Sequence, residues 1–218
     1  MKRLAVLIVA ALLAAALILA MLDLAPAPVQ LPDEVAANLG ASGVRHPVTA
    51  VLLNFRGYDT LLEIAVLLLA LLGLLAVGGL RDEAADAAVE GDPVLPRLAR
   101  LAMPAMLMVA AYLLWAGAFR PGGAFQAGAV LAAAAVLSHL AGLLPSWGSP
   151  ALPLRTGLVA GFIFFLAVAA ALVASGGLLQ YPPQHAGRLI LAIEAGLTAS
   201  LGLTLAGLFL FLSGGGGR

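Results

Sequence analysis

Six long apolar stretches constrain this chain more than any other feature of its sequence. A helix that crosses the hydrocarbon core of a bilayer needs roughly 20 apolar residues. The stretches are rich in Leu and Ala and lack the two-residue alternation of membrane β-strands. We therefore expect an all-α integral membrane protein with about six transmembrane helices, over residues 4–22, 61–80, 98–119, 123–144, 154–176 and 187–212.

The composition agrees with this fold class. Of the 218 residues, 63% are hydrophobic and only 10% are charged, whereas a soluble domain carries about 25% charged residues. The formal net charge is zero, which gives no indication of a nucleic-acid partner. The chain has no cysteine, which excludes disulfides, thiol nucleophiles and cysteine-bound metals.

Basic residues indicate the orientation of the chain in the membrane. A cleaved signal peptide is one interpretation of the first stretch, but its apolar run exceeds the roughly 7–15 residues usual in such peptides, so we expect it to be retained. With the N-terminus inside, seven Lys and Arg residues lie inside and four outside, which favours cytoplasmic termini. The four outer ones are Arg45, Arg56, Arg120 and Arg188.

A polar interval over residues 81–97 divides the chain. It separates a two-helix segment, residues 1–96 with this acidic linker, from a four-helix domain over residues 97–218. Within the first segment, "PDEVAANL" predicts a short interfacial helix, and "HPVTAVLLNF" is apolar enough to dip into the membrane before Gly57 breaks it. The short loops between the later spans leave no room for a soluble catalytic domain, so any chemistry must lie within the membrane or at its edges.

The segment "FRGYDTLLEI" concentrates charge at the start of the second span. "TLLE" matches the capping box, in which Thr60 at the N-cap and Glu63 at N3 satisfy each other's backbone amides. Asp59 would favour the positive helix end, and Arg56 could pair with Asp59. Capping explains these residues locally, but an ion-handling role for Arg56, Asp59 and Glu63 stays open beside it.

Glu194 is the acidic residue that lies deepest in a span. It is about seven residues, or roughly 10 Å, into the last stretch, a depth at which we expect no capping role. Thr198 follows one turn later on the same face. A structural hydrogen bond and a role in ion or proton transfer are the two interpretations. A second face carries small residues suited to close helix packing: Ala192, Gly196, Ser200 and Thr204.

The segment "FRPGGAFQAGAV" predicts a tight turn at Pro121, Gly122 and Gly123, followed by a helix that Gln126 enters. Small residues at Ala124, Gly128 and Ala132 predict close packing of that helix against a neighbour.

Three histidines complete the set of candidate residues. His139, near the inner end of the same helix, could relay protons, although a lone histidine more often has a structural role. His46 and His185 lie in outer loops, and no spacing resembles a metal site.

Two stretches resemble known membrane subunits. "VTAVLLNFRGYDTLLEIAVL" resembles the segment around "FRGFDTLGE" in the C-terminal region of the large subunit of Mrp-type sodium/proton antiporters and in the E-type subunit of membrane-bound hydrogenases. "RPGGAFQAGAVLAA" resembles the "PGGGFQGG" signature of MnhB/MrpB-type antiporter subunits, and "IEAGLTASLGL" fits the end of that domain. The first match covers roughly residues 40–80 and the second roughly 97–218.

The sequence departs from the family pattern at several positions. Leu62 stands where the family usually has a glycine before the glutamate. Ala124 and Ala127 stand at two positions where the signature has glycine. The histidine that often precedes the run is absent, with Ala118, Phe119 and Arg120 in that region. These differences put the packing and ion chemistry of better-known members in doubt for this chain.

The resemblance implies a subunit of a multi-subunit Mrp-type cation(sodium)/proton antiporter in the prokaryotic cytoplasmic (inner) membrane. Large antiporter-like subunits, small helical subunits and lipid would be its partners. It would bind no cofactor, although sodium or protons could be transported. The alternative is an anchoring subunit of a hydrogenase-like or other energy-converting complex without sodium transport. An independent small transporter and a purely structural scaffold also remain open, although no inverted repeat supports the former.

Overall fold

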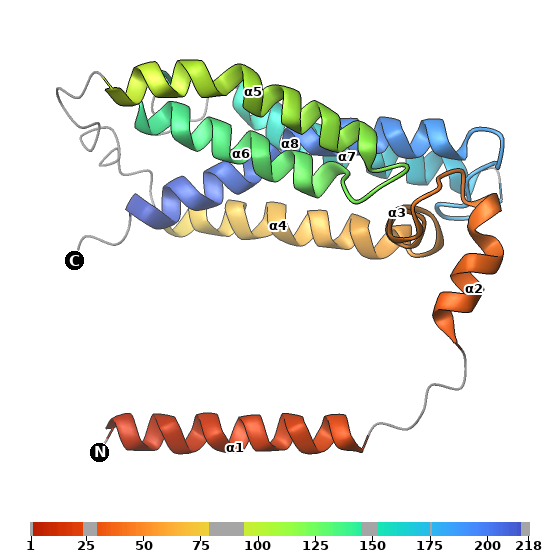
Figure 1. The fold of residues 1–218 in the computed structure, drawn as a ribbon, viewed down its shortest axis with the longest axis horizontal. Helices are drawn as coiled ribbons and strands as arrows, with labels where there is room; N and C mark the ends of the chain where they lie inside the picture. Colours follow the sequence, from red (N-terminus) through yellow and green to blue (C-terminus); the bar gives the residue numbers. More distant parts are fainter. Residues whose placement is uncertain (1, 24–29, 79–93, 145–151, 175, 215–218) are drawn as a thin grey trace. The chain divides into compact units, whose positions relative to one another are not determined.

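A computed structural model describes residues 2–23, 30–78, 94–144, 152–174 and 176–214. Within these ranges every regular element is helical, which confirms the all-α fold class (Figure 1). The elements are α1 (Lys2–Leu22), α2 (Leu31–Asn38), η1 (Leu39–Ala41), α3 (Pro47–Ala50), the π-helix η2 (Val51–Phe55), α4 (Gly57–Gly78), α5 (Val94–Ala116), α6 (Ala124–Leu140), α7 (Leu152–Val173) and α8 (Ala186–Gly214).

The six expected spans correspond to α1, α4, α5, α6, α7 and α8. By length and apolarity α4, α5, α7 and α8 could each cross a membrane, and the apolar parts of α1 and α6 are shorter. The short helix predicted from "PDEVAANL" is confirmed as α2. Most of the acidic linker lies outside the described residues, and the domain division after residue 96 and the orientation of the chain stay predictions.

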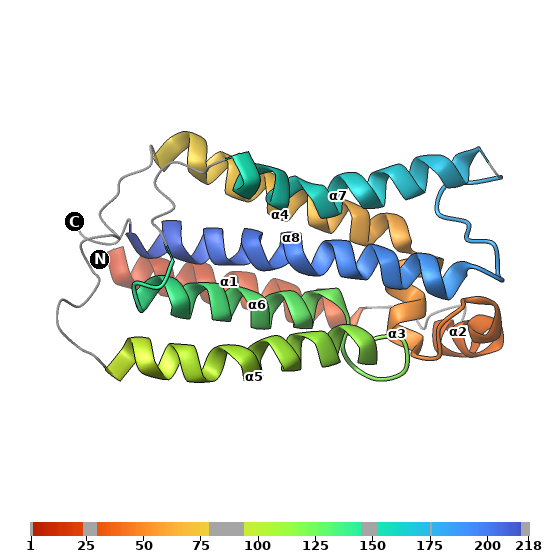
Figure 2. The ribbon, with the colours of Figure 1, turned by 90° about the horizontal axis from the view of Figure 1, so that it is seen from above.

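The chain forms two units, residues 1–34 and residues 35–218. In the second unit α8 is the central helix, because 56% of its membrane-length window is buried, against 28% or less for α4, α5 and α7. Helices α6 and α7 pack on α8 from different sides, α5 packs on α6, and α4 contacts both α7 and α8 (Figure 2). Any side chain on the inner face of α8 is therefore enclosed by α4, α6 and α7.

Small residues set the distance between these helices. Ser200 of α8 accepts a hydrogen bond from the Gly161 amide of α7 at 3.0 Å, and Gly196 faces the same glycine. On the other side, a Cβ atom on Gly128 of α6 would lie 3.0 Å from the Leu201 Cβ of α8. Gly196, Ser200 and Gly128 thus lie at the contacts between these helices. Ala192 differs from this pattern, since it is exposed in the described structure.

Gly161→Ala is expected to weaken the contact between α7 and α8. The added Cβ would collide with Ser200 Oγ and approach the Gly196 carbonyl oxygen to 2.5 Å. Overpacking of this kind costs about 1–3 kcal/mol, and the thermal unfolding midpoint in detergent should fall. Gly73→Ala on α4 is the control, because no atom lies within 4 Å of its added Cβ. If both variants unfold at the wild-type temperature, the tight contact at Gly161 does not exist.

Residues 42–56 form a compact segment that precedes α4. Thr49 Oγ1 donates to the Gly117 carbonyl at 2.6 Å, and the amides of Arg45 and His46 both donate to the Ala118 carbonyl. The helical path breaks at Arg56, where φ is −129°, so Gly57 is the first residue of α4 rather than the break that the sequence suggested. The segment is thus fastened to the turn between α5 and α6.

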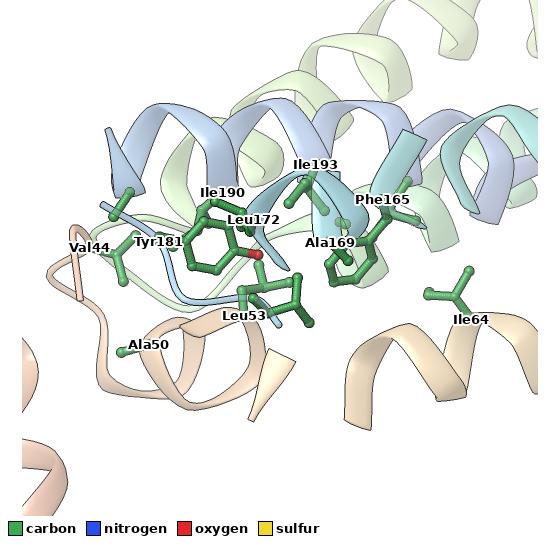
Figure 3. Close-up of a cluster of buried hydrophobic side chains, with 14 of the residues drawn as sticks. Val44, Ala50, Leu53, Ile64, Phe165, Ala169, Leu172, Tyr181, Ile190 and Ile193 are labelled. Atoms are coloured by element: carbon green, nitrogen blue, oxygen red, sulfur yellow. The ribbon is translucent and has the colours of Figure 1, made fainter. Parts of the chain in front are cut away.

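Apolar side chains of the same segment enter the main core of the second unit. Val44, Ala50 and Leu53 are buried together with residues of α7, α8 and the loop that joins them (Figure 3). Because the core includes parts of α4, α7 and α8, the start of α4 and the start of α8 are held at one end of the helix group. That end carries the polar groups described next.

Candidate functional site

Glu194 lies on the enclosed face of α8 and is only 3% exposed. Its Oε1 atom accepts a hydrogen bond from the Ala124 backbone amide at 3.3 Å. Its Oε2 atom has no hydrogen-bond partner among the described residues. Ala124 is the first residue of α6, so the carboxyl group of Glu194 sits against the N-terminus of a neighbouring helix.

The turn between α5 and α6 explains this approach. The Gly123 amide donates to the Leu113 carbonyl at 2.8 Å, which folds the turn back onto the last turn of α5. Gly123 has a φ of +106°, and a Cβ there would collide with Glu194 Oε1. A Cβ on Gly122 would lie 2.5 Å from the Leu113 carbonyl oxygen. The chain bends at Pro121 and Gly123, and the glycines of this connection are needed because backbone and carboxylate come so close.

The N-terminus of α6 gives the carboxyl group a favourable electrostatic partner. The first amides of a helix lack partners within the helix and form a partly positive end. Gly123 at the N-cap has no side chain to satisfy them, and Glu194 takes that role from another helix. The expectation that Glu194 has no capping role is therefore wrong, because the helix end that it caps belongs to α6 and not to its own helix. The departure from the family glycine at Ala124 preserves the contact, because the donor is a backbone amide.

Thr198 lies one turn beyond Glu194 on α8 and is buried. Its hydroxyl donates to the backbone carbonyl of Glu194 at 2.7 Å, and not to the carboxylate. Thr204 makes the same contact with the carbonyl of Ser200 at 2.8 Å. The two threonines therefore share one local geometry, but only Thr198 is adjacent to a buried acid.

The capping box predicted at the start of the second span is wrong. Helix α4 begins at Gly57, so Thr60 lies inside the helix, where its hydroxyl donates to the Leu52 carbonyl at 2.6 Å. The π-helix that precedes α4 brings this carbonyl within reach, which the sequence pattern did not reveal. Glu63 is exposed on α4. The expected ion pair between Arg56 and Asp59 is confirmed.

The other candidate residues lie apart from Glu194. His139 is buried in the last turn of α6, roughly 22 Å along that helix from Ala124, and its Nδ1 atom has no partner among the described residues. Gln126 and Pro121 are exposed. In the described part of the chain no hydrogen bond or ion pair joins Asp59 or Glu63 to Glu194. Within that part, no three acidic or histidine side chains are grouped as metal ligands.

Tyr181 is a buried residue with a polar hydroxyl that no sequence pattern indicates. It lies in the loop between α7 and α8, with its ring among Val44, Leu172 and Ile190 (Figure 3). Its hydroxyl has no partner in the described structure, and burial raises the pKa of the phenol above its usual range. Its neighbours are apolar, so its visible role is packing.

The chain has two similar solved structures with high coverage. One chain of the membrane-bound sulfane sulfur reductase, an archaeal respiratory membrane complex, is 23% identical with a TM-score of 0.76, and 97% of each chain is covered. A chain of the Mrp complex from a Dietzia species is 22% identical with a TM-score of 0.72. That match covers 98% of this chain but 26% of the Dietzia chain. No curated protein sequence matches.

The family comparison is more direct. Residues 94–215, more than half of the chain, match the family described as a domain related to the MnhB subunit of Na+/H+ antiporter. The matched range runs from the start of α5 through α8 and contains both the glycine turn and Glu194. It confirms the resemblance inferred from "RPGGAFQAGAVLAA", whereas the E-type resemblance of residues 40–80 lies outside it. This chain belongs to the family of domains related to the MnhB subunit of Na+/H+ antiporter.

Proposed function

We propose that this chain is a membrane subunit of an Mrp-type sodium/proton antiporter and that Glu194 is a proton-transfer group within it. One observation carries the proposal: a buried carboxyl group contacts the N-terminus of α6, and one of its oxygens has no partner in the part of the chain that the structure describes. An ionisable side chain inside a membrane span is costly and is generally retained for function. Membership of the MnhB family supports the choice of transport over other uses of such a group.

The surroundings of Glu194 favour a proton over a sodium ion as its ligand. In transporters, helix N-termini face anionic groups, whereas carbonyl oxygens and helix C-terminal ends coordinate sodium. Glu194 faces the amide of Ala124, which is a donor at a partly positive helix end. The hydroxyl hydrogen of Thr198 is engaged with a backbone carbonyl. A carboxyl oxygen in this setting can gain and lose a proton without assembling several oxygen ligands.

Asp59, Arg56 and Glu63 form the second part of the proposal. The Arg56–Asp59 pair lies at the start of α4, and Glu63 is exposed one turn further into this apolar helix. A carboxylate in that position requires a polar partner or water, because lipid would not solvate it. We place these groups at a polar entrance shared with a neighbouring subunit, with His139 as a candidate relay at the opposite end of α6.

The chain would act as a non-catalytic subunit without a bound cofactor, in the cytoplasmic membrane of a prokaryote with both termini inside. Large antiporter-like subunits and small helical subunits would be its partners. The similar solved structures support a multi-subunit setting, since both are membrane complexes.

A second candidate function has its own observation. The likeness to a chain of an archaeal respiratory membrane complex covers 97% of both chains, which supports the alternative of an anchoring subunit in a redox-linked complex without sodium transport. Purification of the tagged chain in mild detergent separates the two. Large antiporter-like membrane subunits alone support the antiporter, and soluble redox subunits in stoichiometric amount support the alternative.

Thr198→Val is expected to lower the antiport rate several-fold, because the hydroxyl oxygen adjacent to Glu194 can accept a hydrogen bond in a proton path while its hydrogen is held by a backbone carbonyl. Thr204→Val is the matched control. Each change removes one similar hydroxyl-to-carbonyl bond, worth about 0.5–1.5 kcal/mol. The measurement is the sodium-induced pH change in everted vesicles at equal amounts of assembled complex. Equal rates for the two variants would show that Thr198 has only a structural role.

A further inference from the structure

A cleft of about 380 Å³ opens at the end of the second unit where α8 begins. Its walls come from the segment before α3, from the end of α5 with the following turn, and from the loop that enters α8. Arg45, Trp115, Phe119, Gln184, Arg188 and Leu191 line it. It is separate from the Glu194 carboxyl group, which does not line it, and the proposed proton path does not use it.

The cleft is positively charged. Arg45 and Arg188 both line it, and no described lining residue is acidic. The Arg45 guanidinium lies 6.0 Å from the centre of the Phe119 ring, and in the described structure no carboxylate forms an ion pair with either arginine. Arg188 also lies in the first turn of α8, where a cation opposes the partly positive helix end. An anion bound between the two guanidinium groups would neutralise their positive charge and that of the helix end.

The cleft lies where apolar helices end. Helix α5 ends at Ala116 and α8 begins at Ala186, so both helices leave their apolar spans at its rim. Tyr112, Trp115 and Phe119 form a row of ring contacts, with centroid separations of 6.2 and 5.5 Å. Aromatic side chains gather at the boundary between lipid and water. Trp115 and Leu191 line the same cleft as the arginines and present exposed apolar surface.

We infer that this cleft binds the headgroup phosphate of an anionic phospholipid. The two guanidinium groups would hold the phosphate oxygens, Gln184 would hydrogen-bond the headgroup, and an acyl chain would lie along Trp115 and Leu191. A free phosphate ion offers the same charge but has nothing to cover these two apolar side chains. Arginine is suited to phosphate because its planar fork donates two parallel hydrogen bonds.

The test is lipid binding to the detergent-purified complex that contains this chain, followed by native mass spectrometry. Phosphatidylglycerol is titrated against the wild type and against Arg45→Gln and Arg188→Gln, with phosphatidylcholine as the neutral lipid. Each variant is expected to lose roughly tenfold in phosphatidylglycerol affinity, because it removes one charged hydrogen-bond donor. Arg120→Gln is the matched control. It removes one exposed charge from the same turn region without altering the cleft, and should bind as the wild type does.

Three results would overturn the inference. If both cleft variants bind phosphatidylglycerol with unchanged affinity, the two arginines do not bind the lipid headgroup. Displacement of the lipid by millimolar inorganic phosphate would identify a free-anion site instead. Loss of a protein subunit from the complex in Arg45→Gln or Arg188→Gln, with lipid binding retained, would make the cleft a contact between subunits.

Discussion

Replacing Glu194 with glutamine is expected to abolish sodium/proton antiport while leaving the complex assembled. Glutamine keeps the size of the side chain and an oxygen that accepts the Ala124 amide, so the contact between α6 and α8 is preserved. The amide cannot take up and release a proton. We expect the antiport rate in everted vesicles to fall at least about tenfold, a size typical of the loss of a positioned proton-transfer group.

Assembly and transport must be measured on the same membranes. The amount of complex is read from a pull-down through a tagged partner subunit, and the rate from the sodium-induced recovery of the pH gradient. Glu194→Asp is the informative companion, since it keeps a titratable group but shortens the side chain, and should retain part of the rate. An assembled Glu194→Gln complex with the wild-type rate would refute a proton role for this residue.

Replacing Gly123 with alanine is expected to have the largest effect on stability. Its φ of +106° with ψ of −168° is a conformation that is nearly restricted to glycine, and an added Cβ would meet Glu194 Oε1. Strained backbone of this kind costs about 1–3 kcal/mol, and the collision adds to it. We expect a lower thermal unfolding midpoint in detergent and little assembled complex in membranes.

Gly142→Ala is the matched control for this change. Gly142 also has a positive φ, +67°, but no atom lies within 4 Å of its added Cβ, so only the backbone cost of about 1–2 kcal/mol applies. The double variant Gly123→Ala with Glu194→Ala removes the collision and should unfold at a higher temperature than Gly123→Ala alone. If the double variant unfolds at a lower temperature than Gly123→Ala alone, the Glu194 carboxyl group does not lie against the turn.

The parts of this structure that depend on local patterns could be predicted from the sequence. Apolar length predicted the six long helices, and small residues at four-residue spacing predicted the contacts of Gly128 and Gly196. Opposite charges three residues apart predicted the Arg56–Asp59 pair. Each of these signals lies within one turn or one helix, where geometry follows directly from spacing.

The parts that depend on contacts between distant segments could not be predicted. The bond from the Ala124 amide to Glu194 joins α6 to α8, and no pattern in either helix indicates the partner. Thr60 was misassigned because a π-helix before α4 supplies the Leu52 carbonyl, which changes where the helix begins. Arg45 and Arg188 reach one cleft only through the packing of the segment before α3 against the start of α8.

The most direct test of the proposed function is sodium-dependent proton movement in membranes that contain or lack this chain. Everted vesicles are prepared from cells with the complete set of subunits, from cells in which only this chain is deleted, and from deleted cells that express it again. We predict that sodium collapses the pH gradient in the first and third preparations and not in the second. Equal sodium-dependent collapse in all three would show that this chain has no part in antiport.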